Sequence, residues 1–429
     1  MRKTFFLFAV IFIIFIQAMS SSAEPFVSKA PSYILIDAKT GTVLCQKNAD
    51  TKAYPASTTK ILTAILAIEK GDMNKIATAS REAIHDIGPD GMNIGISTGE
   101  QLRLEDLLNA MLIKSANETA NIVAESLAPT RQDFVNMMNA KAKELGATHS
   151  NFMNPCGMHD NNHYTTPRDL AVIARYALTL PKFREIVVKK SYTMPPTNMH
   201  KKWDTLYTTN RMLYHTSTYF TQVTGVKSGY TGQAGHNLVS SAKNAQGTEL
   251  IAVIMGESGN AKYQVALDSK LLLEHGFRDY ALQKVVNAKQ LVKSMFVGGS
   301  EEKVRLNLVT GSEFSSILPK NKNEWNMTTK QVIPPHIKLP VKKGDIVGTL
   351  EYYREGSLIG KVNLVAASSI NKDASKKAPK AKKGSLFFTI IKVLLGLVLF
   401  FFALRLTLRT ISRRLKAKRK RKAYHIDIK

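Results

Sequence analysis

The sequence predicts an α/β domain of the α+β type, in which an antiparallel sheet is flanked by helices around one buried helix. Strand-turn-strand patterns stand near both ends of residues 24–276, with helical patterns between them. The run 60–69 is apolar on nearly every side, as in a helix enclosed by its domain. Alternating residues then predict a small all-β domain at 277–370, and the apolar stretch 385–404 predicts a C-terminal membrane helix.

The N-terminal segment 1–23 has the features of a secretory signal peptide. Arg2 and Lys3 precede the apolar stretch from Phe5 to Ile16, and small residues lead up to Ala23. This order predicts cleavage after Ala23, so the segment is excluded from the fold. An uncleaved N-terminal anchor is the alternative, although the apolar run is short for a membrane span.

The C-terminal segment is organised as a linker, a membrane helix and a basic tail. Residues 371–384 are rich in Lys, Ala, Ser and Pro, which is typical of a flexible charged linker. The stretch 385–404 is long enough to cross a bilayer, and only Lys392 interrupts it. By the positive-inside rule the tail 405–429 stays cytoplasmic, which places the bulk of the chain outside the cell membrane. A helix lying in the membrane interface is the alternative.

The formal net charge of +27 does not predict nucleic-acid binding, because much of it lies in the tail. Between Lys372 and Lys429 there are 18 Lys or Arg residues and 2 Asp residues. Basic residues beside a membrane helix are explained by topology and by anionic lipid. We therefore expect a membrane as a partner, and no nucleic acid.

Cysteines and histidines predict neither a disulfide framework nor a metal site. Cys45 and Cys156 are the only cysteines. An exported chain could pair them, but a domain of this size has enough core without a disulfide, so two free, mostly buried thiols are expected. His159 and His163 stand in a polar loop and lack the spacing of metal ligands. We expect no cofactor.

The first strand-turn-strand pattern leads to the buried helix. Residues 33–36 and 42–44 are apolar and flank the turn 38–41. Ser57 and Lys60 stand three apart where the helix begins, so they lie on one face and the amine can reach the hydroxyl. This pairing can activate a serine without a histidine. The helix start would also bring free backbone N–H groups close to Ser57.

The Ser-x-x-Lys pattern is weak evidence by itself, because it occurs twice more. The other copies run from Ser240 to Lys243 and from Ser369 to Lys372. Neither is followed by the two further motifs described next, which come after the first copy. We therefore select the first copy.

A second polar motif lies between two predicted helices. The spacing of apolar residues in 104–112 predicts one helix, and 118–127 predicts the next. Ser115-Ala116-Asn117 forms the short turn between them, which is a rigid mount for a hydroxyl and an amide. Serine and asparagine are also common helix caps, so the tripeptide alone is not diagnostic.

A third motif is expected on a strand. The segment 224–232 and the apolar run 250–254 predict strands that follow one another through turns. Lys227, Ser228 and Gly229 stand near the end of the first strand. A cation and a hydroxyl can bind a carboxylate there, and glycine lets a substrate backbone approach closely. An ordinary polar strand end is the alternative.

In this order the three motifs resemble those of the penicillin-binding proteins and serine β-lactamases. From about Pro25 to about Ala366 the chain is similar to low-molecular-mass D-alanyl-D-alanine carboxypeptidases, including the loop 154–157. The resemblance implies a penicillin-binding/β-lactamase-like transpeptidase fold with a β-rich stalk domain. Ser228 departs from the threonine usual in that family but keeps the hydroxyl. The predicted membrane span departs from the amphipathic anchor of many relatives.

The resemblance also implies a mechanism. Ser57 would attack the carbonyl between the two terminal D-alanines of a peptidoglycan stem peptide, while Lys60 takes its proton. Lys60 must be neutral to do so, and burial together with the second cation Lys227 would favour that state. Ser115 and Asn117 would complete the proton relay and hold the substrate amide.

Substrate binding would fall to the third motif. The resemblance implies that Lys227, Ser228 and Gly229 receive the end of the peptide, with its terminal carboxylate gripped by the first two. The backbone N–H groups of Ser57 and Tyr230 would form the oxyanion hole. β-Lactams, which mimic this end of the substrate, would bind covalently to Ser57.

Three other functions remain open. A β-lactamase needs a deacylating base, and Glu185 is the only glutamate between Glu144 and Lys227, in what resembles an ordinary helix end. A D,D-endopeptidase would not need the free carboxylate. A non-catalytic wall-binding protein would not need every motif position intact.

The second domain has no comparable set of polar residues. Residues 304–308 and 337–341 alternate apolar and polar side chains, and turns are expected at 344–345 and 355–356. These patterns predict the strands of the stalk.

Overall fold

The computed structural model describes residues 28, 30–88, 91–214, 220, 222–259, 262–298, 304–371, 391–405 and 407–409. The predicted signal peptide, and nearly all of the predicted linker and basic tail, lie outside these residues. The described residues form two compact units. One takes in those of Met1–Lys293, Leu308–Pro335 and Ile346–Val365, and the other those of Ser294–Asn307, His336–Asp345 and Ala366–Lys429.

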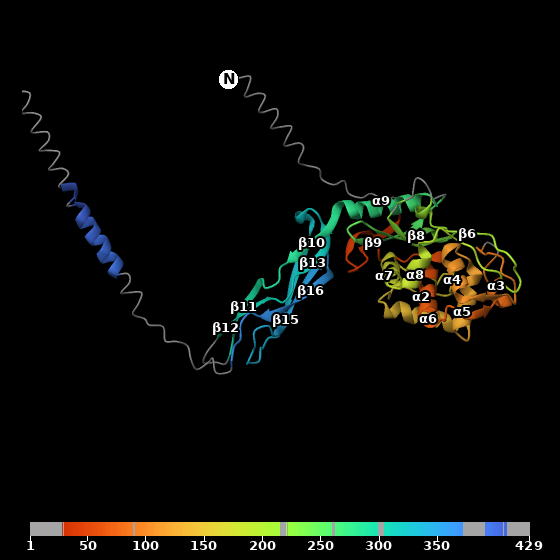
Figure 1. Cartoon of the computed structure of the whole chain (residues 1–429), viewed down its shortest axis with the longest axis horizontal. Helices are drawn as coiled ribbons and strands as arrows, with labels where there is room; N and C mark the ends of the chain where they lie inside the picture. The colour runs from red at the N-terminus through yellow and green to blue at the C-terminus, as the bar shows by residue number, and fades with distance from the viewer. Residues whose placement is uncertain are drawn as a thin grey trace, which may run out of the picture. The chain divides into compact units, whose positions relative to one another are not determined.

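A five-stranded antiparallel sheet forms the centre of the first unit (Figure 1). Its order is β2-β1-β9-β8-β7. The strands are β1 (Ser32–Asp37), β2 (Val43–Lys47), β7 (Val223–Thr231), β8 (Gly235–Lys243) and β9 (Glu249–Glu257). The strands predicted around 33–36, 42–44, 224–232 and 250–254 are all present. Because β1 lies next to β9, the N-terminal hairpin joins a sheet completed some 200 residues later.

Both faces of this sheet are buried, and side-chain alternation assigns residues to each. On β1, Ile34 and Ile36 belong to the core shared with the helices, whereas Tyr33 and Leu35 belong to the core beneath α9 (Gln264–Asp279). Successive strand residues point to opposite faces, so a strand covered on both sides must be apolar throughout. This explains the continuous apolar run in β9.

The predicted buried helix is α2 (Lys60–Lys70), and its residues from Lys60 to Ala67 are all buried. It packs against α4 (Leu104–Ile113), α5 (Asn117–Leu127) and α7 (Pro167–Ala177) on the helical side of the sheet. Ser57 is not part of this helix. It lies in the preceding 3₁₀ turn η1 (Ala56–Thr59), which follows Pro55. A proline at this point suits the start of a helical turn because it has no N–H to leave unpaired.

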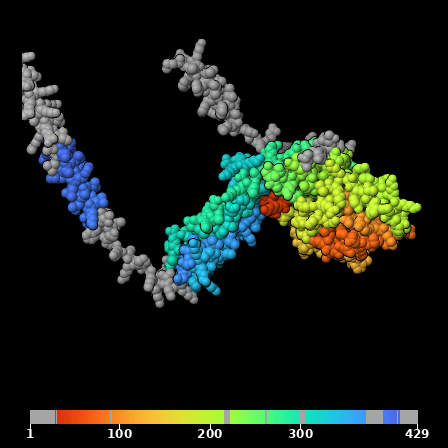
Figure 2. All heavy atoms as spheres, in the orientation of Figure 1, coloured from red at the N-terminus to blue at the C-terminus, as the bar shows by residue number. Residues whose placement is uncertain are grey.

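The turn η2 (Arg211–Leu213) packs against α9 and β7, whereas α4, α5, α6 (Arg131–Glu144), α7 and α8 (Pro181–Val187) pack around α2. In Figure 1 they cover one side of the sheet, and Figure 2 shows segments from early and middle parts of this chain region side by side on one face. The stretch 191–221, where the sequence predicts loop or unplaced short strands, contains only two-residue strands and a 3₁₀ turn among its described residues. The bounds are α3 (Arg81–His85), α4 (Leu104–Ile113), α5 (Asn117–Leu127), α6 (Arg131–Glu144), α7 (Pro167–Ala177), α8 (Pro181–Val187), β3 (Ile76–Thr78), β4 (Gln101–Arg103), β5 (Ser191–Tyr192), β6 (Leu206–Tyr207) and η2 (Arg211–Leu213).

The chain after α9 is β-rich, as the sequence predicts. One sheet has the order β11-β12-β16-β15-β14, and β10 pairs with β13. Turns at Gly344 and Glu355–Gly356 are present. The bounds are β10 (Tyr280–Val286), β11 (Leu291–Val297), β12 (Val304–Thr310), β13 (Phe314–Pro319), η3 (Lys322–Glu324), β14 (Met327–Val332), β15 (Ile346–Arg354) and β16 (Ser357–Ala366).

The prediction of a strand at 337–341 is wrong. Only Val341 forms a bridge, with Ile370, and the bond between Leu339 and Pro340 is cis. Proline cannot donate a ladder hydrogen bond, so alternation of side chains in this segment does not produce a strand.

One C-terminal helix, Ile391–Arg409, is long and apolar enough to cross a membrane by length and composition. Its described side chains are exposed. The first residues of the predicted span, 385–390, lie outside the described part of the chain.

Candidate active site

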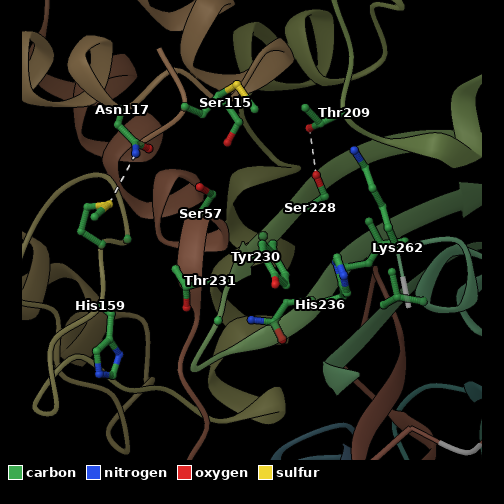
Figure 3. Close-up of a pocket in the computed structure, with 18 of the residues that line it drawn as sticks. Ser57, Ser115, Asn117, His159, Thr209, Ser228, Tyr230, Thr231, His236 and Lys262 are labelled. Atoms are coloured by element: carbon green, nitrogen blue, oxygen red, sulfur yellow. Dashed lines mark hydrogen bonds between the residues drawn. The ribbon is translucent and has the colours of Figure 1, made fainter. Parts of the chain in front are cut away.

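A cavity of about 710 Å³ lies where η1, the start of α5 and strand β7 meet. Figure 3 shows that the hydroxyls of Ser57, Ser115 and Ser228 approach it from three different elements. The three predicted motifs, which are far apart in sequence, therefore meet at one place. Six predicted site residues line it: Ser57, Ser115, Asn117, Ser228, Gly229 and Tyr230. The other two, Lys60 and Lys227, are 0% and 1% exposed and lie beneath its wall.

Lys60 holds the centre of the site through three contacts. Its Nζ atom lies 2.9 Å from Ser57 Oγ, 2.6 Å from Asn117 Oδ1 and 2.7 Å from the backbone oxygen of Cys156. The first contact is the predicted one, because Ser57 and Lys60 share a face where the 3₁₀ turn passes into α2. The other two come from elements distant in sequence, and they fix the position of the amine.

Burial changes the protonation of both lysines. It lowers the pKa of Lys60 from 10.5 to about 8, although Cys156 and Glu118 act in the opposite direction. Burial, followed by repulsion from Lys60, lowers the pKa of Lys227 well below its ordinary value. Desolvation disfavours the charged form of an amine, so both groups become neutral far more easily than a lysine in water.

Asn117 and Ser115 are presented by the turn between α4 and α5. Asn117 is the first residue of α5, and its backbone N–H donates to the carbonyl of Met92. Its side-chain oxygen accepts a hydrogen bond from Lys60, while the only hydrogen-bond partner of its Nδ2 among the described residues is the sulfur of Met158, at 3.5 Å. Ser115 has a φ of 70°, a conformation uncommon for serine, which turns the chain sharply between the helices. The amide N–H₂ of Asn117 therefore faces the cavity with a weak partner.

The third motif is mid-strand rather than near a strand end, because β7 runs four residues beyond Lys227. β7 is an edge strand of the sheet, so one row of its backbone groups faces the site rather than another strand. Lys227 Nζ donates to the backbone oxygen of Ser228 at 2.9 Å, and Ser228 Oγ donates to Thr209 Oγ1 at 2.8 Å. Tyr230, at the rim, stacks on His236.

Two glycines let the chain close around Ser57. A Cβ on Gly229 would lie 2.9 Å from the Pro55 oxygen and 3.0 Å from the Ser57 nitrogen, which is too close for any side chain. A Cβ on Gly157, whose φ is 89°, would lie 1.9 Å from the oxygen of Ala56. Strand β7 and the loop after Asn154 thus pack directly against the turn that carries Ser57.

Several residues of the site cannot be found from local patterns. The carbonyl of Cys156 reaches Lys60 because Asn154 Oδ1 accepts the N–H groups of Gly157 and Met158 and bends the loop. An Asn-Pro-x-Gly sequence predicts such a turn but not its target. Thr209 belongs to an aperiodic segment with no motif. Further lining residues are Met92, Met158, His159, Arg211, His236 and Lys262.

The structure also places both cysteines, His163 and Ser240. Both cysteines are free, Cys156 buried and Cys45 partly so. His163 is a buried loop residue whose Nε2 lies 2.9 Å from Thr59 Oγ1, and burial lowers its pKa to about 4. Ser240, the second Ser-x-x-Lys serine, is buried in β8 away from the cavity lining. Among the described residues no group of His, Cys, Asp and Glu could hold a metal ion.

Comparison with known proteins identifies relatives for both parts of the chain. Residues 18–259 match the family described as D-alanyl-D-alanine carboxypeptidase (peptidase S11), and residues 280–372 match the C-terminal domain of penicillin-binding protein 5. D-alanyl-D-alanine carboxypeptidase DacF of Bacillus subtilis is 31% identical over 347 residues, or 80% of this chain and 86% of the relative. DacA of Haemophilus influenzae is 28% identical over 348 residues, or 80% and 85%.

A solved structure has the same fold as this chain. The crystal structure of penicillin binding protein 5 from Haemophilus influenzae is 26% identical and superposes with a TM-score of 0.64, covering 82% of this chain and 100% of that one. The predicted fold class and the predicted carboxypeptidase function are thereby confirmed. The chain belongs to the peptidase S11 family of D-alanyl-D-alanine carboxypeptidases.

Proposed function

We propose that this carboxypeptidase uses Ser57 as its nucleophile and removes the terminal D-alanine from peptidoglycan stem pentapeptides through an acyl-enzyme. The observation that carries this proposal is the position of the Lys60 amine, which lies 2.9 Å from Ser57 Oγ in a fully buried setting. A serine hydroxyl needs an adjacent base to attack a carbonyl. Lys60, with a pKa of about 8, is such a base.

In the acylation step the Ser57 oxygen bonds to the carbonyl carbon between the two D-alanines while its proton passes to the lone pair of Lys60. The tetrahedral intermediate then expels the amine of the last residue, which takes up a proton and leaves as D-alanine. Ser115 and Asn117 line the cavity beside Ser57. In this proposal Ser115 relays the proton to the leaving amine, and the Asn117 amide N–H₂ holds the substrate carbonyl.

In the second step water attacks the Ser57 ester and regenerates the enzyme. Negative charge forms on the carbonyl oxygen in both steps, and backbone N–H groups of Ser57 and Tyr230 are proposed to stabilise it. Gly229 supports this arrangement, because its lack of a side chain lets β7 approach η1. Loss of one such donor typically costs about a hundredfold or more in rate.

The charge of the cavity favours an anionic substrate end. Arg211 and Lys262 line it, and none of its described lining residues is an aspartate or glutamate. Ser228 presents a hydroxyl to the same cavity from the strand that covers Lys227. We propose that this side of the cavity receives the free carboxylate of the substrate, which favours a carboxypeptidase over an endopeptidase. β-Lactams carry a carboxylate in the corresponding place and would acylate Ser57.

A β-lactamase activity is less well supported, because it requires a base for rapid deacylation. Glu185 of α8 pairs with Lys182 of the same helix and with Lys189, which follows the helix. Glu118 is buried and accepts the backbone N–H of Ile94 at 2.6 Å. Neither carboxylate belongs to the lining of the cavity in which the Ser57 ester would form.

We propose that the chain is held at the cell membrane by its C-terminal helix, with the carboxypeptidase outside the cytoplasm. The support is the apolar helix Ile391–Arg409 and the basic sequence after it. Protease added to intact spheroplasts should leave an epitope placed after Lys429 protected. Digestion of that epitope in intact spheroplasts would instead favour a helix lying in the interface.

The experiment that tests the reaction is D-alanine release from a synthetic pentapeptide by wild-type protein and by Ser57→Ala. Ser369→Ala is the matched control, because Ser369 belongs to another Ser-x-x-Lys run but is exposed in the stalk region. Release by the wild type and the control, and none by Ser57→Ala, is expected. Release that persists in Ser57→Ala would overturn the assignment.

A further inference from the structure

The hydroxyl of Ser228 does not act alone in the cavity, because it is hydrogen-bonded to a second hydroxyl. Ser228 Oγ donates its hydrogen to Thr209 Oγ1 at 2.8 Å (Figure 3). Both residues are partly exposed and both line the cavity. The proton of Ser228 is therefore engaged with a protein group when substrate arrives.

Thr209 is held firmly although it belongs to an irregular segment. Its backbone N–H donates to the carbonyl of Ile113 at the end of α4, and the N–H of Thr208 donates to the carbonyl of Lys190. The Asn210 side chain then caps the turn η2 by accepting the N–H of Met212. These bonds on both sides fix the position of the Thr209 hydroxyl opposite β7.

A threonine hydroxyl has one hydrogen to donate and two lone pairs to accept with. One lone pair of Thr209 Oγ1 accepts from Ser228, and within the described residues its own hydrogen goes to no protein group. The hydrogen bond from Ser228 polarises the Thr209 hydroxyl and makes it a stronger donor. The chain of two hydroxyls thus ends in one hydrogen available to an acceptor in the cavity.

The charges around the cavity indicate which acceptor can bind this hydrogen. Arg211 and Lys262 line the same cavity, and none of the described lining residues carries an acidic side chain. Lys227 is not the direct contact in this arrangement, because the residue is 1% exposed and its amine donates to the backbone carbonyl of Ser228. An anion in the cavity can therefore bind the hydroxyl pair, while Arg211 and Lys262 supply positive charge around it.

We propose that Thr209 is a specificity-determining residue whose hydroxyl binds the terminal carboxylate of the substrate directly, with Ser228 as the group that orients it. This assignment rests on the proposed function, since it names the group that reads the free C-terminus.

Two thioester substrates separate the effect on the carboxylate from the effect on chemistry. Both carry the same acyl-D-alanyl group, and the thiol that leaves bears either a free carboxylate or its methyl ester. Thiol release gives kcat/KM for each. Thr209→Val deletes the hydroxyl at nearly constant volume, Thr209→Ser keeps it, and Thr205→Val removes an exposed hydroxyl that pairs with Thr193 outside the cavity.

With the free acid, Thr209→Val should lower kcat/KM by about 10- to 100-fold, the range expected for a hydrogen bond to a charged group. With the methyl ester it should change kcat/KM by less than about threefold. Thr209→Ser and Thr205→Val should stay near wild type with both substrates. If Thr209→Val does not fold, Thr209→Ala gives the same comparison with a smaller side chain.

Equal losses with both substrates, or no loss with the free acid, would overturn the role of Thr209 while leaving the carboxypeptidase mechanism intact. A wild-type protein that turns over neither thioester and is not acylated by a penicillin would overturn the proposed function itself. The two failures are therefore distinguishable in one set of measurements.

Discussion

The amine of Lys60 lies 2.9 Å from the hydroxyl oxygen of Ser57, and its two other partners can only accept hydrogen bonds from it. These are the amide oxygen of Asn117 and the carbonyl oxygen of Cys156. A neutral amine has two hydrogens and one lone pair. When both hydrogens are given to these fixed acceptors, the lone pair points at the remaining neighbour, Ser57. The same contacts that bury Lys60 thus orient it as a base.

Acylation should depend on pH through Lys60. Because only the neutral amine can take the proton and its pKa is about 8, the acylation rate should rise as pH increases through 8 and level off above it. At pH 7 roughly a tenth of the amine is neutral. The second-order rate constant for acylation by a penicillin, measured from pH 6 to 10, checks this. A rate that falls across the same interval would show that the charged amine is the active form.

The charge of Glu118 should affect the pH at which the acylation rate rises. Its carboxylate is buried beside the site and raises the pKa of Lys60. Glu118→Gln keeps an acceptor for the N–H of Ile94 but removes the charge, so the pKa of Lys60 should fall and the rise in rate should move to lower pH. The pH profile of the variant is the measurement.

Glu185→Gln is the matched control for Glu118→Gln, because Glu185 pairs with two partly exposed lysines, Lys182 and Lys189. It should leave the midpoint of the profile unchanged. A midpoint that stays in place for Glu118→Gln, or that moves to higher pH, would refute the electrostatic role of Glu118.

Gly229 should be sensitive to a single methyl group. Alanine at this position would push β7 away from the Pro55 oxygen and the Ser57 nitrogen, and so displace the nucleophile from its surroundings. We expect Gly229→Ala to lower acylation by about 10- to 100-fold, as small misplacements of reacting groups do. Rate constants and a thermal unfolding curve together check this.

Gly232→Ala is the control for Gly229→Ala. It lies on the rim of the same cavity, and a Cβ there would meet nothing within 4 Å. Acylation should stay within about threefold of wild type. Equal rates for the two variants would mean that β7 and η1 do not need to approach so closely.

The sequence predicts most of the catalytic pattern because the three motifs are local. Ser57 and Lys60 share one face of a helical turn, and the Ser115 turn is bounded by two strongly periodic helices. What brings the motifs together is not local. β7 reaches Ser57 through the register of a five-stranded sheet and through the missing side chain of Gly229. Spacing along the chain carries no information about such contacts.

Other features escape prediction for different physical reasons. The backbone carbonyl of Cys156 acts at the site without involving its side chain, so residue identity gives no sign of it. Thr209 owes its place to backbone hydrogen bonds in a segment with no periodic pattern. The alternation at 337–341 predicts a strand, but Pro340 removes a donor from it.

Locating the covalent adduct of a penicillin is the direct test of Ser57 as the nucleophile. The full-length protein is incubated with a penicillin and digested, and the modified peptide is sequenced by mass spectrometry. We predict one adduct, on Ser57, and none in Ser57→Ala. An adduct on any other residue, or an adduct that forms equally in Ser57→Ala, would contradict it.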